Sequence, residues 1–134
     1  MHRTIKVVAA IIIEDGRLFA TQRGYGAWKD WWEFPGGKVE TGETPEDALV
    51  REIKEELDTL VSVEEFFMTV EYDYPEFHIS MDCFICSIIS GELTLLEHES
   101  SSWLPLSDPW QVRWLPSDIE VVEQISRRVR HGRY

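Results

Sequence analysis

The chain has 134 residues, of which 43% are hydrophobic, and its formal net charge at pH 7 is -12. This length and composition suit one folded domain and exclude an intrinsically disordered chain. The negative charge repels phosphate backbones, so a nucleic-acid polymer is disfavoured as a partner. A small anionic ligand remains compatible with this charge if metal cations bridge it to the protein.

The N-terminal segment predicts two antiparallel strands. Basic residues precede an apolar run in MHRTIKVVAAIII, but Glu14 and Asp15 follow at once, without the cleavage pattern of a signal peptide. No segment reaches the roughly 18 apolar residues of a membrane span. We expect a strand over 4–13, a turn at 14–17 and a strand over 18–23, in a cytoplasmic protein without a membrane partner.

The second half of the chain predicts further strands and a closing helix. We expect strands near 61–72, 77–89 and 92–96, a loop broken by Pro105, Pro109 and Pro116, and a helix from about Ser117 to Arg130. No internal repeat or low-complexity tract is present. One mixed α/β domain over residues 1–134 is therefore the predicted organisation.

Cys83 and Cys86 have the spacing of a CxxC motif. They lie in the apolar run ISMDCFICSII, which is typical of a strand. Residues three apart in a strand point to opposite faces, so the two sulfur atoms diverge. We expect buried structural thiols rather than a redox or zinc pair.

The segment VREIKEELD gathers acidic side chains on a helix that Thr44 and Pro45 are suited to begin. At about 100° per residue, Glu52, Glu55 and Glu56 fall within roughly one quadrant of this helix. Taken alone, such a run is usually a solvated face. The preceding loop, PGGKVETGE, changes this interpretation because it adds backbone carbonyls and two more glutamates. Clustered carboxylates with carbonyl oxygens are typical ligands of Mg2+ or Mn2+.

The spacing of these residues resembles the Nudix box, G-x5-E-x7-R-E-U-x-E-E-x-G-U. Seven of its nine defined positions agree: Gly37, Glu43, Arg51, Glu52, Ile53, Glu55 and Glu56. Asp58 stands where the family has Gly, and Thr59 where it has an aliphatic residue. This departure puts the geometry of the helix end in doubt, because Asp adopts the left-handed conformation less easily than Gly.

The longer stretch WEFPGGKVETGETPEDALVREIKEEL is similar to the MutT-like branch of the Nudix hydrolases, which includes 8-oxo-dGTP diphosphatases and CTP pyrophosphohydrolases. The resemblance spans most of the chain, is strongest over 31–57 and is weak after 110. It implies a Nudix fold of the α/β (α+β) class, with a mixed β-sheet sandwiched between helices and the box as a loop-helix-loop.

The resemblance also implies a set of site residues. The metal ligands would be one backbone carbonyl and four carboxylates: Gly36, Glu52, Glu55, Glu56 and Glu97. Glu52 would be either a ligand or the base that activates water, and Arg51 would orient a carboxylate. Glu97 matches a loop carboxylate that approaches the metal in this branch.

Substrate contacts are expected around this cluster. Lys38 would contact phosphate oxygens, and Arg23 would add positive charge beside them. Phe77 and His78 are expected on a strand facing the box, where an aromatic side chain can stack on a base. For Trp28, which lies close to the box, core packing and base stacking both remain open.

Asp118 resembles the base-reading residue of the branch. A carboxylate accepts hydrogen bonds from an exocyclic amine such as cytosine N4, so we hypothesise that Asp118 favours an amino-bearing base. The competing interpretation is a helix N-cap, with Ser117 as a rival for that role.

The implied activity is Mg2+-dependent hydrolysis of a nucleoside triphosphate to a monophosphate and pyrophosphate, with Mn2+ as a second suitable ion. The expected substrates are CTP, dCTP or oxidised dGTP-type nucleotides, handled by a monomer or homodimer. Hydrolysis of another nucleoside diphosphate derivative, such as ADP-ribose, and a silent nucleotide-sensing domain remain alternatives. The sequence leaves open the preferred base, the number of metals and the phosphorus that water attacks.

Overall fold

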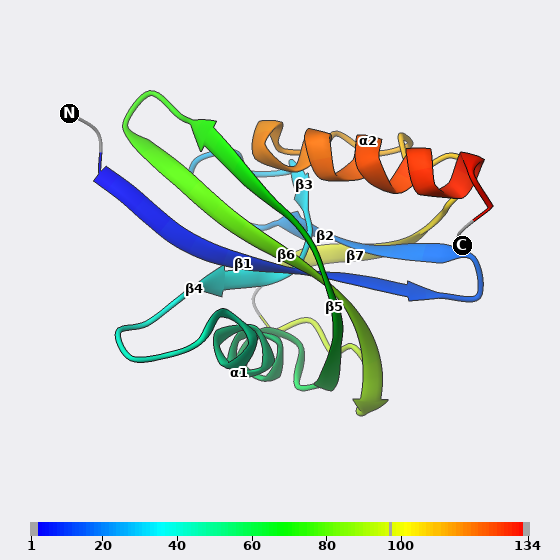
Figure 1. The fold of residues 1–134 in the computed structure, drawn as a ribbon, viewed down its shortest axis with the longest axis horizontal. Coiled ribbons are helices and arrows are strands. Elements are labelled where there is room, and N and C mark those ends of the chain that lie inside the picture. Colours follow the sequence, from blue (N-terminus) through cyan, green and yellow to red (C-terminus); the bar gives the residue numbers. More distant parts are fainter. Residues whose placement is uncertain (1–2, 97, 133–134) are drawn as a thin grey trace.

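A mixed sheet with a helix on each side forms the protein. The computed structural model describes residues 3–96 and 98–132. In this part of the chain seven strands form the sheet, and helices α1 (Pro45–Leu57) and α2 (Pro116–Arg130) lie on opposite sides of it (Figure 1). This arrangement confirms the predicted fold class. No helix of the described part is long and apolar enough to cross a membrane.

Strand β1 (Arg3–Glu14) is central to the sheet. It pairs in parallel with β6 (Phe77–Ser90), and β6 pairs in antiparallel fashion with the edge strand β5 (Leu60–Asp73). These three strands agree within a residue or so with the expected strands at 4–13, 61–72 and 77–89.

On the side away from β6, β1 pairs with two different strands along its length. Residues 7–9 pair with β4 (Gly36–Lys38), whereas Ile13 and Glu14 pair with β2 (Arg17–Arg23). Strand β2 also pairs with β3 (Trp32–Glu33) and β7 (His98–Pro105). The short strands β3 and β4 lie in the segment that its Pro and Gly residues mark as irregular, and they bring this segment onto the sheet beside α1.

Two expectations for the last third of the chain are wrong. Residues 92–96 do not form a strand, because the backbone N–H groups of Thr94 and Leu96 donate to the carbonyls of Leu57 and Glu56 at the end of α1. The segment that joins the sheet is β7, whose run of three serines has little strand propensity. This segment is a strand because it pairs with β2, and no local sequence pattern predicts that pairing.

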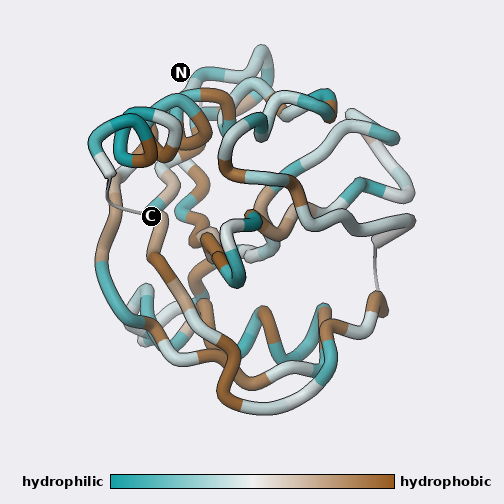
Figure 2. The backbone as a smooth tube through the Cα atoms, turned by 90° about the vertical axis from the view of Figure 1, so that its right-hand side faces the viewer, coloured by the Kyte–Doolittle hydropathy of each residue, from teal (hydrophilic) through white to brown (hydrophobic). Residues whose placement is uncertain are grey.

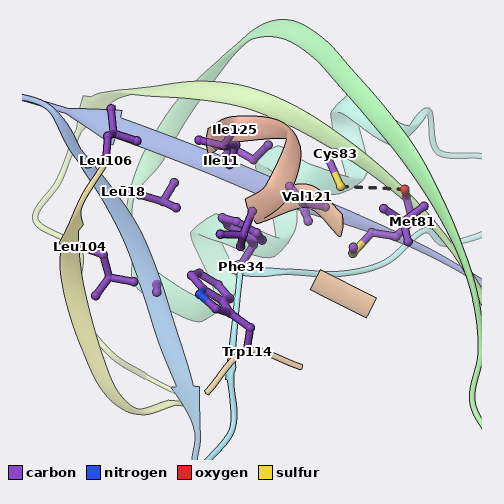
Figure 3. Close-up of a cluster of buried hydrophobic side chains, with 14 residues drawn as sticks. Ile11, Leu18, Phe34, Met81, Cys83, Leu104, Leu106, Trp114, Val121 and Ile125 are labelled. Carbon is purple, nitrogen blue, oxygen red and sulfur yellow. Dashed lines mark hydrogen bonds between the residues drawn. The ribbon is translucent and has the colours of Figure 1, made fainter. Parts of the chain in front are cut away.

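Alternation along β1 divides the core into two clusters. Ala9 and Ile11 face α2, and Figure 3 shows Ile11 beside Val121 and Ile125 of that helix. Val8, Ala10 and Ile12 face α1 and pack in the cluster that contains its residues Leu49, Ile53 and Leu57. Figure 2 shows hydrophobic and hydrophilic residues alternating along the helical coils, as expected for helices that each bury one face.

The positions of the two cysteines confirm the prediction that their side chains point to opposite faces of a strand and are buried. Cys83 belongs to the cluster on the α2 side and Cys86 to the cluster on the α1 side, and both thiols are free. Burial raises the pKa of Cys86 to about 12 and also raises the pKa of Cys83. Both side chains are therefore neutral packing groups.

Candidate functional site

Local sequence signals set both ends of α1. The Thr44 side chain caps the helix by accepting a hydrogen bond from the Asp47 backbone N–H at 3.1 Å, and Pro45 is the first helical residue. The helix ends at Asp58, which has a φ of 49° and a left-handed conformation. Lys54 Nζ contacts the Asp58 carboxylate at 2.8 Å. Aspartate therefore adopts the conformation for which the family uses glycine.

The two glycines of β4 allow the helix to approach closely. A Cβ atom on Gly37 would collide with the carboxylate of Glu52, and a Cβ atom on Gly36 would collide with the carbonyl oxygen of Val8. The Gly36 backbone N–H donates to the Glu56 carboxylate at 3.1 Å. Two carboxylates of α1 therefore lie against the backbone of β4, beside which α1 is seen in Figure 1.

Arg51 lies at the centre of the acidic cluster. Its guanidinium donates to both oxygens of Glu43 at 2.7 and 2.9 Å, to Glu52 at 2.9 Å and to Glu55 at 3.2 Å. It also donates to the backbone carbonyl of Lys38 at 3.0 Å. Through Arg51 these contacts join Glu52 and Glu55 of the helix to Glu43 and Lys38 of the loop before it. Orientation of a carboxylate by Arg51 is thus a feature of this geometry.

Hydrogen bonding from Arg51 lowers the pKa of Glu43 from 4.5 to about 2. The ion pair therefore stabilises the fold above about pH 4.5, and this contribution is lost as the pH falls through 2. We expect Glu43→Gln to lower the melting temperature by a few degrees at neutral pH and to have little effect near pH 2. Thermal unfolding of both proteins across this pH range measures the difference. A difference independent of pH would contradict the assignment.

The donors at this junction fit a divalent cation. Glu52 and Glu56 lie against the two glycines of β4, and Arg51 joins Glu52 to Glu55. Oxygen donors of this kind are preferred by Mg2+ and Mn2+. Among residues 3–96 and 98–132, no three His, Cys, Asp or Glu side chains stand at metal-binding separation. The guanidinium of Arg51 lies among these carboxylates.

Two other expected site residues, Lys38 and Arg23, lie in different places relative to this cluster. Lys38 ends β4, and its backbone carbonyl accepts from Arg51, so it belongs to the cluster. Arg23 ends β2, where its guanidinium pairs with Glu33 at 3.3 Å and donates to the carbonyl of Ala27 at 3.3 Å. Glu97 lies outside the described residues.

Asp118 is buried in the first turn of α2, with 3% of its surface exposed. Its Oδ2 accepts from the Phe34 backbone N–H at 3.2 Å. Burial, and then the charge of Glu33, raises the pKa of Asp118 well above 3.8, although Phe34, Arg23 and Ser117 oppose this. The N-cap of α2 is Leu115, so Asp118 is not the helix cap.

Phe77 and His78 point to opposite faces of β6, as neighbours in a strand do. The Phe77 ring lies 5.4 Å from that of Tyr74, whose hydroxyl contacts Ser117 beside Asp118. The two ring nitrogens of His78 each lie 2.6 Å from a carboxylate, that of Asp73 or of Glu71, and these contacts raise its pKa. The structure brings Phe77 toward Asp118 and does not bring His78 there.

No local sequence signal marks Glu33 or Tyr74 as neighbours of Asp118. Glu33 lies in the WEFPGG stretch, but only the pairing of β2 with β3 places it beside Arg23. Tyr74 lies in the turn between β5 and β6, 43 residues from Ser117. The contacts of Glu33 with Arg23 and of Tyr74 with Ser117 depend on how strands and helices pack, so they become visible only in the folded structure.

Comparison with known proteins settles the family. The family model described as the NUDIX domain matches residues 2–125. The chain belongs to the Nudix family. This Nudix protein is 34% identical over 122 residues to the CTP pyrophosphohydrolase of Escherichia coli K12, with 90% of each chain covered. It is 32% identical over 121 residues to the 8-oxo-dGTP diphosphatase of the same organism, with 90% of this chain and 94% of the other covered.

A solved structure supports the same assignment. The crystal structure of a MutT Nudix hydrolase from Burkholderia pseudomallei matches this Nudix protein with a TM-score of 0.80 and 28% identity, covering 92% of this chain and 98% of the other. The protein is therefore a MutT-like Nudix hydrolase. Nudix hydrolases act on small nucleotide substrates and generally use divalent metal ions.

Proposed function

We propose that this protein is a Mg2+-dependent nucleoside triphosphate pyrophosphohydrolase, which converts a nucleoside triphosphate and water into a monophosphate and pyrophosphate. The observation that carries this proposal is the junction of β4 and α1, where Glu52 and Glu56 lie against Gly37 and Gly36. Mn2+ suits the same oxygen donors. The names of the E. coli relatives, CTP pyrophosphohydrolase and 8-oxo-dGTP diphosphatase, support this reaction class.

Hydrolysis of a phosphoanhydride requires an aligned water molecule and neutralisation of the developing negative charge. The cations would be held by four carboxylates and one backbone carbonyl: those of Glu52, Glu55, Glu56, Glu97 and Gly36. When bound, the cations supply positive charge for the phosphate oxygens and lower the pKa of coordinated water.

The chain's own residues have separate roles in this proposal. Arg51 holds Glu52 by a hydrogen bond of 2.9 Å, which keeps that carboxylate oriented toward the glycine loop as a ligand or as the base for water. The exposed side chain of Lys38 extends from the end of β4 and would bind phosphate oxygens. The sequence predicts Arg23 beside the phosphates, but Arg23 pairs with Glu33 and lowers the pKa of Asp118, so it would add positive charge on the side of the base.

Base recognition is assigned to Asp118, with Phe77 on the same side. The Phe34 N–H contacts Asp118, and the Gly36 N–H contacts Glu56. These two N–H groups are two residues apart, and the bend at Pro35 between them lets them bind carboxylates from the two helices. A carboxylate that accepts from an exocyclic amine supports CTP or dCTP, and oxidised dGTP-type nucleotides are the second group of substrates.

A nucleotide panel tests the proposal. We expect release of pyrophosphate from CTP, dCTP or 8-oxo-dGTP in the presence of Mg2+, and none with excess chelator. Cleavage of ADP-ribose alone would favour the alternative hydrolase. The absence of metal-dependent turnover of every nucleotide would favour a nucleotide sensor. Because the expected substrates are free nucleotides, we infer that the enzyme acts in the cytoplasm as a monomer or homodimer.

A further inference from the structure

The first turn of α2 is capped by a residue from another element. Its N-cap residue, Leu115, has no side-chain hydrogen bond to the helix. The Ser117 backbone N–H, which a capping side chain would normally bind, donates instead to the hydroxyl oxygen of Tyr74 at 3.2 Å. The same hydroxyl donates to Ser117 Oγ at 2.9 Å. Tyr74 therefore supplies the cap that Leu115 lacks.

Ser117 extends this contact to Asp118. The Ser117 hydroxyl accepts from Tyr74 and keeps its single proton for another acceptor. Asp118 is the next residue in the chain, and the polar Ser117 side chain beside it lowers the pKa of Asp118, against the effect of burial. The Asp118 carboxylate accepts from Phe34 N–H, and its own backbone N–H donates to the Leu115 carbonyl at 2.9 Å, so Asp118 is held in the turn that Tyr74 caps.

Tyr74 is itself held in one place. It is 6% exposed, and its ring packs against those of Trp28 at 5.7 Å, Tyr72 at 4.8 Å and Phe77 at 5.4 Å. Trp28 has a φ of 66°, a conformation that a bulky residue keeps only when its surroundings hold it. Burial raises the pKa of the Tyr74 hydroxyl, so it stays protonated and remains a donor.

We propose that Tyr74 is a positioning residue for base selection, because its hydroxyl fixes Asp118 through Ser117. This inference rests on the proposed nucleotide hydrolysis and on the proposed role of Asp118 in it. Tyr74 needs no contact with the substrate for this role. Its effect is confined to the choice of base, since the hydroxyl contacts α2 and not the cluster around Arg51.

The test is Tyr74→Phe, which keeps the ring and removes the hydroxyl. We expect the ratio of kcat/KM for CTP over UTP, or for 8-oxo-dGTP over dGTP, to fall about tenfold. The loss should appear in KM of the preferred nucleotide and leave kcat unchanged, because the acidic cluster is intact. Ser117→Ala should reduce the same ratio, and the double variant should reduce it no further, since both changes break one chain of contacts.

Tyr72→Phe is the matched control. Its ring belongs to the same aromatic group, but the structure shows no hydrogen bond from its hydroxyl to any described residue. We expect this variant to keep the wild-type ratio. A folded Tyr74→Phe protein with unchanged ratios for both pairs would overturn the inference, as would equal losses on all nucleotides.

Failure of the proposed function is recognised separately, because wild-type protein would then hydrolyse no triphosphate. Calorimetric titration with CMP and with UMP, without metal, measures the binding affinity for each base independently of turnover. We expect wild-type protein to distinguish the two monophosphates and Tyr74→Phe to distinguish them less. Equal binding of both by wild-type protein would overturn the inference about Tyr74.

Discussion

Replacing Glu56 by glutamine should lower kcat about a thousandfold while the protein stays folded. Glu56 is 8% exposed and accepts from the Gly36 N–H, a bond that the glutamine oxygen can keep. The substitution removes the negative charge that would hold a cation, and a thousandfold loss corresponds to about 4 kcal/mol. Pyrophosphate release measures the rate, and titration calorimetry with Mn2+ measures the binding of the ion.

Glu46→Gln is the matched control for this change. Glu46 lies in the first turn of the same helix and is exposed, so its loss affects only the interaction with the helix dipole. We expect wild-type activity and Mn2+ uptake from this variant. Wild-type Mn2+ uptake by Glu56→Gln would show that the carboxylates of α1 do not hold the ion.

Replacing Asp118 by asparagine should make the protein more stable and less selective. A buried carboxyl with a raised pKa destabilises the fold once the unfolded chain ionises, and the neutral amide removes this penalty. We expect a rise in melting temperature of about 5 °C at neutral pH. Because an amide both donates and accepts, the preference for CTP over UTP should fall about tenfold.

The difference in stability between wild type and Asp118→Asn should change with pH in one direction. Below pH 3.8 the carboxyl is protonated in both folded and unfolded chains, so wild type and Asp118→Asn should have similar stability. As the pH rises above this value, wild type should become the less stable of the two. Glu120→Gln, an exposed change on the same helix, should leave both properties unchanged. A lower melting temperature for Asp118→Asn at neutral pH would contradict the assignment of a charge penalty to Asp118.

The features that were predictable from sequence depend on neighbours along the chain. The start of α1 follows from Thr44, Pro45 and the acidic residues after them, and helical periodicity alone gathers Glu52, Glu55 and Glu56. The divergence of Cys83 and Cys86 follows from strand alternation. Capping and periodicity act over a few residues, so a short segment contains all the information they need.

The features that were not predictable depend on residues far apart in the chain. The serines of β7 become a strand by pairing with β2, whereas the better-patterned residues 92–96 bind the end of α1. Asp118 is joined to Phe34, 84 residues earlier, and Ser117 to Tyr74. The sequence predicts a strand with Phe77 and His78 that faces the box, but neighbours in a strand point to opposite faces, and only Phe77 packs against Tyr74.

The short connection from β3 to β4 limits how the sequence of this enzyme can change. The amide of Phe34 binds Asp118 and the amide of Gly36 binds Glu56, so both ends of the proposed nucleotide site depend on one stretch of three residues. Insertion of a single residue there would move one amide away from its carboxylate, because the bend at Pro35 sets the directions of both amides. The length of this stretch is therefore constrained in any variant that keeps both contacts.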